Sequence, residues 1–153
     1  MIIAVDFDGT IVEHAYPKIG KPVPFAMDVL KRLQAEEAHT FLLWTVRSGK
    51  LLDEAVEYCE KNGFSFYAAN KNSPEEDETK SPRKLLADLF IDDRNFGGLP
   101  DWGVIYKVIK KGGKSLYDFE EMMNDDQGRQ KRSNKNFFIK FGEAWDRARG
   151  RGF

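Results

Sequence analysis

The chain has 153 residues, of which 41% are hydrophobic and 32% are charged, and its formal net charge is −1. These values describe an ordinary soluble globular domain that can bury a substantial core. No segment approaches the length of a transmembrane helix, and the N-terminus lacks the pattern of a signal peptide. The single cysteine, Cys59, cannot form an intrachain disulfide, which fits a reducing compartment. Together with the lack of a membrane span and of a signal peptide, this predicts a cytoplasmic protein without a membrane partner.

The charges are unevenly distributed along the chain. Residues 1–126 contain 16 Lys and Arg and 23 Asp and Glu, a net charge of −7, whereas residues 127–153 contain 8 and 2, a net charge of +6. A segregated basic segment can contact nucleic acid or another acidic surface, or it can lie on the acidic body of its own domain. We favour the second interpretation and leave the first open.

Strand and helix patterns alternate from the N-terminus to about residue 106. Apolar runs rich in β-branched and aromatic residues indicate strands, and apolar residues three to four positions apart indicate helices. The predicted elements are, in chain order, a strand over 1–5, a helix over 25–37, a strand over 40–44, a helix over 48–62, a strand over 64–69, one or two helical turns over 81–87, and strands over 89–91 and 104–106. This order predicts an α/β domain with a parallel sheet flanked by helices.

The C-terminal part of the chain differs in pattern from the rest, and we predict a domain over 1–123 followed by a basic tail over 124–153. Apolar side chains recur in the tail at helical spacing: Phe137, Phe138, Phe141, Ala144, Trp145 and Ala148. This spacing predicts an amphipathic helix over about 134–149. Its apolar stripe favours docking against the domain or a partner, and stacking on single-stranded nucleic acid is the alternative.

Polar side chains follow three of the predicted strands. The first strand ends in Asp6 and Asp8, whose i and i+2 positions point to the same side of an extended backbone. The second strand ends in Thr45, and the fourth ends in Asp92 and Asp93. Ligands of open α/β sheets bind beyond the carboxyl ends of the strands. Carboxylates that meet there repel one another unless a cation lies between them, and their oxygens suit Mg²⁺.

Lys84 precedes the fourth strand and adds an ammonium group to this set. Carboxylates for a cation, with a hydroxyl and an ammonium for an anion, suit the transfer of a phosphoryl group. The plainer alternative is that residues 6–10 form an ordinary turn, that Thr45 is a strand residue and that Lys84 is solvated. Lys80 and Arg83 compete with Lys84 for the role of the cation.

The order and content of these motifs resemble the haloacid dehalogenase superfamily of phosphohydrolases, most of whose members are Mg²⁺-dependent phosphatases. The run Asp6-Phe7-Asp8-Gly9-Thr10 matches the first motif, DxDGT, and Thr45 matches the second. Lys84 is a plausible third motif, and Asp92-Asp93 match the acidic fourth. The resemblance covers about residues 1–106 and implies a three-layer Rossmann-like domain with a central parallel sheet.

The resemblance also implies a role for each matched carboxylate. Asp6 would be the nucleophile that forms an aspartyl-phosphate, and Asp8 would protonate the leaving oxygen and later activate water. Mg²⁺ would be held by Asp6, by the backbone carbonyl of Asp8 and by the fourth motif. In that motif Asp93 would contact the metal directly, and Asp92 would orient the site or bind through water.

Four further residues are candidates for contacts with the phosphate. The resemblance implies that Thr45 donates a hydrogen bond to a phosphoryl oxygen and that Lys84 pairs with both Asp6 and the phosphate. Arg47 and Ser48, at the start of the second helix, are candidates for additional anion contacts beside its N-terminal amides. An ordinary exposed arginine is an equal alternative for Arg47. His14 and His39, which complete the histidines of the chain, are interpreted as surface or packing residues.

The spacing of the motifs leaves no room for a cap domain of the kind that often sets specificity in this superfamily. Between Asp8 and Thr45 lie 36 residues, and between Thr45 and Lys84 lie 38, which the predicted elements use up. Without a cap the site is expected to be open, narrowed by a flap over residues 13–24, an acidic loop over 70–80 or the basic tail. The run Asp92-Asp93-Arg94 also resembles the fourth motif of 5′(3′)-deoxyribonucleotidases.

Other classes of protein share parts of this pattern. A signalling receiver domain also places acidic residues, Thr and Lys around Mg²⁺, but its phosphoacceptor Asp follows the third strand, and residues 64–69 contain none. A nucleotide or polynucleotide-end phosphatase, or a non-catalytic module that binds nucleic acid or a partner through the tail, remains an alternative. We predict a Mg²⁺-dependent phosphatase of a small phosphorylated substrate, and leave open whether it forms a homo-oligomer.

Overall fold

The computed structural model describes residues 1–36, 39–77, 79–121, 123 and 124. The contacts along the chain divide it into two units, Met1–Lys114 and Ser115–Phe153. In the second unit, residues 116–121 are helical. The amphipathic helix predicted over 134–149 lies outside the described residues. Within the described part of the chain, no helix is both long enough and apolar enough to cross a lipid bilayer.

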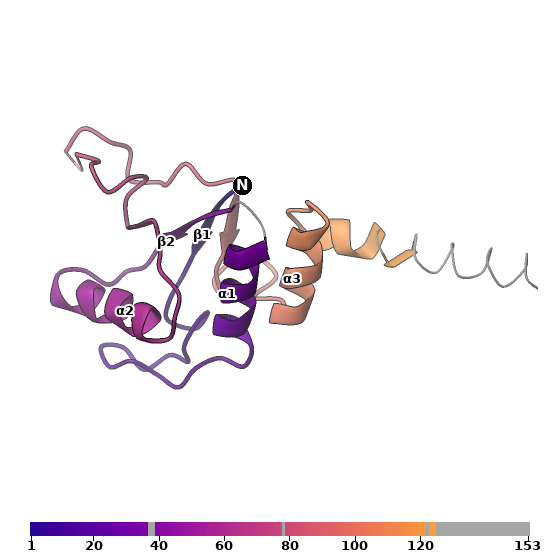
Figure 1. The fold of residues 1–153 in the computed structure, drawn as a ribbon, viewed down its shortest axis with the longest axis horizontal. Helices are drawn as coiled ribbons and strands as arrows, with labels where there is room; N and C mark the ends of the chain where they lie inside the picture. Colours follow the sequence, from indigo (N-terminus) through magenta and orange to yellow (C-terminus); the bar gives the residue numbers. More distant parts are fainter. Residues whose placement is uncertain (37–38, 78, 122, 125–153) are drawn as a thin grey trace, which may run out of the picture. The chain divides into compact units, whose positions relative to one another are not determined.

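A four-stranded parallel sheet lies at the centre of the first unit (Figure 1). Its spatial order is β3 (Ala68–Ala69), β2 (Thr40–Leu43), β1 (Ile2–Val5) and β4 (Leu89–Ile91). The last residue of β1, Val5, is in register with Leu43 of β2 and Ile91 of β4. The residues that follow these three strands therefore start from the same edge of the sheet. The α/β class and the parallel sheet predicted from the sequence are confirmed.

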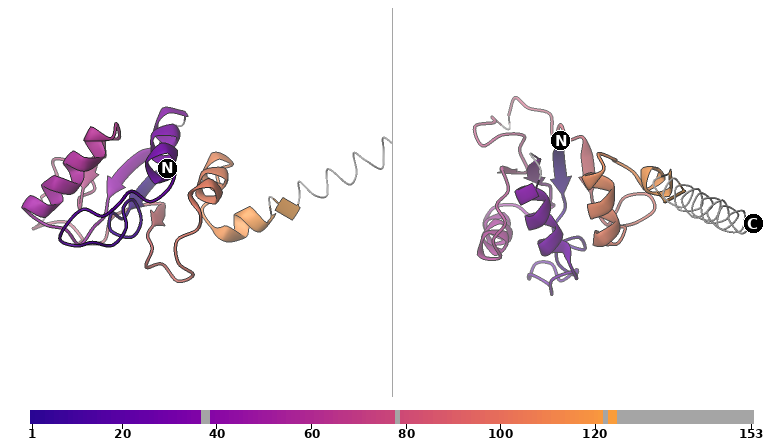
Figure 2. Two further views of the ribbon diagram at one scale, coloured as in Figure 1. Left: turned by 90° about the horizontal axis from the view of Figure 1, so that it is seen from below. Right: turned by 45° about the vertical axis from the view of Figure 1, so that its right-hand side comes forward.

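Three helices of the first unit share one hydrophobic cluster with one face of the sheet. They are α1 (Ala26–Glu36), α2 (Lys50–Lys61) and α3 (Trp102–Lys110). The cluster includes Val5 and Leu43 of the strands, together with Leu30, Cys59 and Ile105 of the three helices. Helices α1 and α3 lie side by side (Figures 1 and 2). Because successive side chains of a strand point to opposite faces of the sheet, this cluster uses every second strand residue, such as Ile3 and Val5.

The other face of the sheet packs against the β3–β4 connection, which we define as residues 70–88. Ala4, Leu42 and Ala68 form a second cluster with Leu85 of this connection. None of its described residues is helical, so the helical turns predicted over 81–87 are wrong. In place of a helical bond, the amide of Leu86 donates to Asn72 Oδ1 at 2.6 Å. The connection is therefore held by side-chain contacts, which a local pattern does not show.

The strand predicted over 104–106 is also wrong, because these residues belong to α3. Asp101 caps this helix, since its Oδ1 accepts a hydrogen bond from the Gly103 amide at 2.8 Å. Trp102, Ile105 and Ile109 are buried, and their spacing is that of one helix face. Three apolar residues alone do not distinguish a buried strand from a buried helix. The third strand is shorter than predicted, since only Ala68 and Ala69 pair with β2.

Candidate functional site

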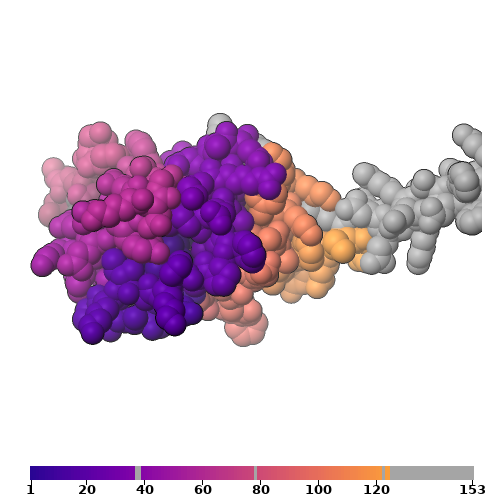
Figure 3. Space-filling model, turned by 60° about the horizontal axis from the view of Figure 1, so that its bottom comes forward, coloured from indigo at the N-terminus to yellow at the C-terminus, as the bar shows by residue number. Residues whose placement is uncertain are grey.

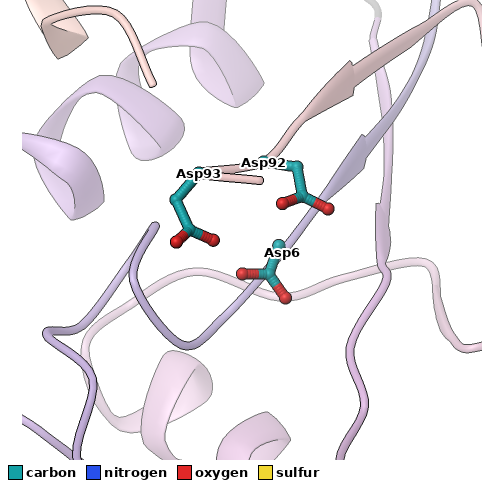
Figure 4. A group of neighbouring side chains, drawn as sticks. All are labelled: Asp6, Asp92 and Asp93. Carbon is teal, nitrogen blue, oxygen red and sulfur yellow. The ribbon is translucent and has the colours of Figure 1, made fainter. Parts of the chain in front are cut away.

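Three carboxylates meet at the edge of the sheet where β1 and β4 end. They are Asp6, Asp92 and Asp93, and we call this set the acidic cluster (Figure 4). One oxygen from each side chain lies within 4.8 Å of the others. The Asp6 amide donates to the carbonyl oxygen of Ile91 at 2.9 Å, which extends the pairing of the two strands by one residue. The sheet thus brings together residues that are more than 80 positions apart in the sequence.

The acidic cluster is electrostatically costly. Burial raises the pKa of Asp6 to about 7, and the charges of Asp92 and Asp93 add to this rise. Hydrogen bonds from the Phe7 amide and the Thr10 hydroxyl oppose it. Asp93 Oδ1 is buried without a hydrogen-bond partner among the described residues. A buried carboxylate oxygen without a donor is unfavourable, so a cation bound here would stabilise the site.

Thr10 connects the two sides of the acidic cluster. Its buried hydroxyl donates to Asp6 Oδ2 at 3.2 Å and accepts from the Asp93 amide at 3.1 Å. Its carbonyl oxygen accepts from the indole of Trp102 at 3.2 Å, which ties the loop to the start of α3. Gly9 has φ +97°, and a Cβ there would lie 2.7 Å from Asp93 Oδ2. The Gly-Thr pair of the motif therefore has a local structural reason.

The carboxylate of Asp8 lies apart from the acidic cluster and pairs with Arg47. Arg47 is fully buried, and its Nε and Nη2 atoms each donate to a different Asp8 oxygen at 2.7 Å. These bonds raise the pKa of Arg47. From the sequence, Arg47 was predicted to be either an anion contact or an exposed arginine, and the exposed alternative is wrong. The sequence around Asp8 did not indicate that Arg47, 39 positions away, would bind its carboxylate.

The same guanidinium also contacts the flap, residues 13–24. Nη1 of Arg47 donates to the carbonyl oxygen of Pro17 at 3.0 Å, and Nη2 donates to that of Lys18 at 2.9 Å. The guanidinium carbon lies 5.0 Å from the ring centroid of Phe7 and 5.5 Å from that of Tyr16. Arg47 thus joins the residue after β2 to both the first motif and the flap.

Thr45 and Arg47 are held in place by a residue that the sequence analysis missed. Asn70 follows β3, and its Oδ1 accepts from the Thr45 amide at 2.8 Å. Its Nδ2 donates to the carbonyl oxygen of Arg47 at 3.1 Å. The hydroxyl oxygen of Thr45, a buried residue, accepts from the Arg47 amide at 3.3 Å. Asn70 has φ +54°, a conformation that Asn tolerates, and its place after a strand is the signal that could have identified it. Ser48 is exposed just before α2.

His14 of the flap reaches the acidic cluster. Its Nε2 lies 2.8 Å from Asp93 Oδ2, and its side chain is 50% exposed. The flap and the segment after β4 accordingly lie beside each other on the face shown in Figure 3. From the sequence, His14 was predicted to be a surface or packing residue, because no partner lies at metal-ligand spacing from it along the chain. The exposed position is confirmed, but the contact with Asp93 was not foreseen.

Lys84 does not contact the acidic cluster in this structure. It is exposed on the β3–β4 connection, and its Nζ lies 5.8 Å from the ring centroid of Phe90. The main contributions to the pKa of Asp6 come from burial, hydrogen bonds and carboxylates, with no cation among them. Lys80, the competing lysine, pairs with Asp77 at 3.2 Å. The ion pair between Lys84 and Asp6 therefore stays a prediction.

Comparison with known proteins finds a match among solved structures. Neither a family model nor a curated protein sequence matches the chain. A solved structure does match: the conserved protein coded by locus from Bacteroides thetaiotaomicron is 60% identical, with a TM-score of 0.71. The match covers 78% of this chain and 96% of that one. At this identity and coverage, the chain belongs to the same family as the conserved protein of Bacteroides thetaiotaomicron.

Proposed function

We propose that the chain is a metal-dependent phosphatase of the haloacid dehalogenase type, with a three-layer Rossmann-like fold and no cap. The observation that carries the proposal is the acidic cluster at the ends of two adjacent parallel strands, with Asp8 two residues beyond Asp6. Carboxylates at that edge of a sheet repel phosphate unless a cation neutralises them. The set of motifs resembles that superfamily in order as well as in residue type.

The donor set of the acidic cluster fits Mg²⁺. All of its side-chain ligands are oxygens, and Asp93 Oδ1 is buried and unpaired in the described structure. Asp6, Asp92 and Asp93 would hold the ion, together with the backbone carbonyl of Asp8. The ion would supply positive charge for the phosphoryl oxygens. Its presence would also favour the ionised form of Asp6, whose pKa is otherwise raised to about 7.

Asp6 and Asp8 carry the two proton-coupled steps in this proposal. An oxygen of Asp6 bonds to phosphorus as the bond to the leaving oxygen breaks, and that oxygen takes a proton from Asp8. A water molecule then gives a proton to Asp8 while its oxygen bonds to phosphorus, and the bond from Asp6 to phosphorus breaks. The net reaction converts an ester and water into an alcohol and phosphate, with both residues restored.

Thr45 and Lys84 would bind the phosphoryl oxygens. The hydroxyl oxygen of Thr45 accepts from Arg47, so its own proton can be donated to a phosphoryl oxygen. The role of Lys84 depends on the resemblance, because it requires the lysine to leave the Phe90 ring and approach Asp6. Thr45 is therefore the better supported of the two anion contacts.

The test is hydrolysis of p-nitrophenyl phosphate with and without Mg²⁺. Wild type should turn over only with the metal, and Asp6→Asn should lower kcat by at least about 10³-fold, because the nucleophile is lost. Asp28→Asn is the matched control, since Asp28 is an exposed residue of α1 away from the motifs. Equal rates for wild type and Asp6→Asn would overturn the assignment of Asp6, and metal-independent turnover would overturn the metal-dependent mechanism.

A further inference from the structure

We infer that Arg47 is a positioning residue that fixes the Asp8 carboxylate and the flap relative to each other. The claim that Arg47 holds the flap depends on the structure alone. The claim that Arg47 orients Asp8 for catalysis rests on the proposed function. As a consequence, losing the hydrogen bonds between Asp8 and Arg47 should make the flap more mobile. Losing the guanidinium of Arg47 should affect both Asp8 and the flap. The proposed function by itself assigns no such role to Arg47.

The geometry of the guanidinium supports this linkage between Asp8 and the flap. Two of its N–H groups bind the two oxygens of Asp8, and two bind consecutive carbonyl oxygens, those of Pro17 and Lys18. A planar fork with five N–H donors can serve both partners at once, whereas an ammonium cannot reproduce this arrangement. The side chain of Arg47 is fully buried. Its bonds to Asp8 are therefore shielded from water, whereas its bonds to the flap are part-buried.

Arg47 is itself held by the ends of the neighbouring strands. Its amide donates to the hydroxyl oxygen of Thr45, and its carbonyl oxygen accepts from Asn70. Its guanidinium stacks over the buried ring of Phe7. A side chain fixed along its whole length is suited to orient the groups that it binds. Arg47 therefore acts as the fixed point to which Asp8 and the flap attach.

Contacts other than those with Arg47 also support the flap, since Ile19 is partly buried and packs against the core cluster. The base of the flap is paired by backbone bonds from the Glu13 amide to the Lys21 carbonyl oxygen at 2.7 Å and from Val23 to Ile11 at 2.9 Å. The side chain of His14 adds a contact to Asp93, but it is half-exposed. Exposed ion pairs hold their partners weakly. Among the described hydrogen bonds, those from Arg47 join the carbonyl oxygens of Pro17 and Lys18 to a fully buried side chain.

The first experiment measures hydrogen exchange in peptides that cover the flap. Arg47→Lys and Asp8→Asn should both increase exchange over residues 13–24 by at least about 10-fold, while exchange in β1 and α2 stays unchanged. Asp8→Asn is the decisive variant, because the side chain of Asp8 bonds to Arg47 and reaches the flap carbonyl oxygens through it. Arg32→Lys is the matched control, since Arg32 makes a similar ion pair at an exposed surface.

Two outcomes of the hydrogen-exchange experiment would overturn the linkage between Asp8 and the flap. A wild-type rate of flap exchange in Asp8→Asn would overturn the linkage, as would an increase spread evenly over the whole first unit in both variants. Because Asp8→Asn nearly preserves the shape of the side chain, it also serves if Arg47→Lys fails to fold. None of these outcomes depends on catalytic activity.

The second experiment compares kcat/KM for phenyl phosphate and p-nitrophenyl phosphate, two esters of similar shape. Phenolate is the poorer leaving group and needs the proton from Asp8 more. Arg47→Lys should therefore lower kcat/KM for phenyl phosphate by at least about 10-fold more than for p-nitrophenyl phosphate. Arg32→Lys should leave both values unchanged.

Two failures of the second experiment are distinguishable. Equal losses for the two esters in Arg47→Lys would overturn the positioning of Asp8 while leaving the proposed function intact. Absence of Mg²⁺-dependent turnover of either ester by wild type would overturn the proposed function as measured with these esters, and with it the claim that Arg47 orients Asp8 for catalysis. The hydrogen-exchange experiment then tests by itself whether Arg47 holds the flap.

Discussion

Asp6 and Asp8 are separated by one residue in the chain, yet their carboxyl groups lie in opposite electrostatic surroundings. Asp6 faces two further carboxylates, and burial among them raises its pKa to about 7. Asp8 faces a buried guanidinium that binds both of its oxygens. Two identical side chains at one strand end are thus prepared for different tasks by what the fold places beside them. Phe7 lies between them with its ring in the core.

The largest effect is expected at the Asp8–Arg47 side of this comparison. Arg47→Met leaves a buried carboxylate without its donors, so the free energy of unfolding should fall by about 3–5 kcal/mol. Urea denaturation measures this loss. Arg32→Met is the control, because Arg32 pairs with Glu36 at 2.6 Å on the exposed surface of α1 and should matter far less. Equal losses in the two variants would contradict the account of the buried pair.

A cation bound at the acidic cluster should raise the free energy of unfolding, whereas Arg47→Met should lower it. Free Mg²⁺ at about 100 times its Kd should stabilise the fold by about 2.7 kcal/mol. The rise in Tm should be larger at about pH 8 than at about pH 5.5, because protons compete with the ion for Asp6, whose pKa is about 7. Differential scanning fluorimetry with a Mg²⁺ titration measures both. A pH-independent rise in Tm, or a rise retained in Asp93→Asn, would place the ion elsewhere.

A smaller effect is expected from removing one charge of the acidic cluster. The folded pKa of Asp6 lies above the ordinary value of 3.8, so ionised Asp6 destabilises the metal-free fold as the pH rises from about 4 through 7. Asp6→Asn should therefore be more stable than wild type by about 1–2 kcal/mol at about pH 8, with no such gain at about pH 4. Urea denaturation in EDTA at the two pH values measures this difference. A variant less stable than wild type at the higher pH would refute the repulsion.

The smallest effect is expected at the half-exposed contact between His14 and Asp93. His14→Ala should change the free energy of unfolding by less than about 1 kcal/mol, because exposed ion pairs contribute little. Thermal denaturation at matched buffer conditions measures this change in stability. Lys50→Ala is the control, because it removes the exposed ion pair between Lys50 and Glu54 of α2. A loss as large as that of Arg47→Met would mean that the flap is held chiefly by His14.

Local patterns in the sequence were sufficient to predict β1, β2, β4 and the acidic cluster. β1 and β4 are short apolar runs, and the carboxylates follow them directly, so the rule for the carboxyl edge of a parallel sheet places Asp6, Asp92 and Asp93 together. The end of α2 was also predictable, because Gly63 adopts φ +82° after it. These features depend on neighbouring residues and on one general rule of topology.

The contacts that refine the site depend on residues far apart in the chain, and no local pattern predicted them. Arg47 meets Asp8 across 39 positions, and Asn70 meets Thr45 across 25. Both contacts exist because β2 lies between β1 and β3 in the sheet. The lysine of the third motif was predicted from its place before the fourth strand, within helical turns that the β3–β4 connection does not form. The site was therefore predictable in its charges and not in its cross-strand partners.

The most direct test of the central claim is to trap the aspartyl-phosphate. Wild type is incubated with p-nitrophenyl phosphate and Mg²⁺, quenched with borohydride, and analysed by peptide mass spectrometry, which detects reduction of an acyl phosphate at the residue that carried it. The account predicts reduction at Asp6, only with substrate and Mg²⁺, and none at Asp8. Turnover with no modification of Asp6, or modification at another carboxylate, would contradict it.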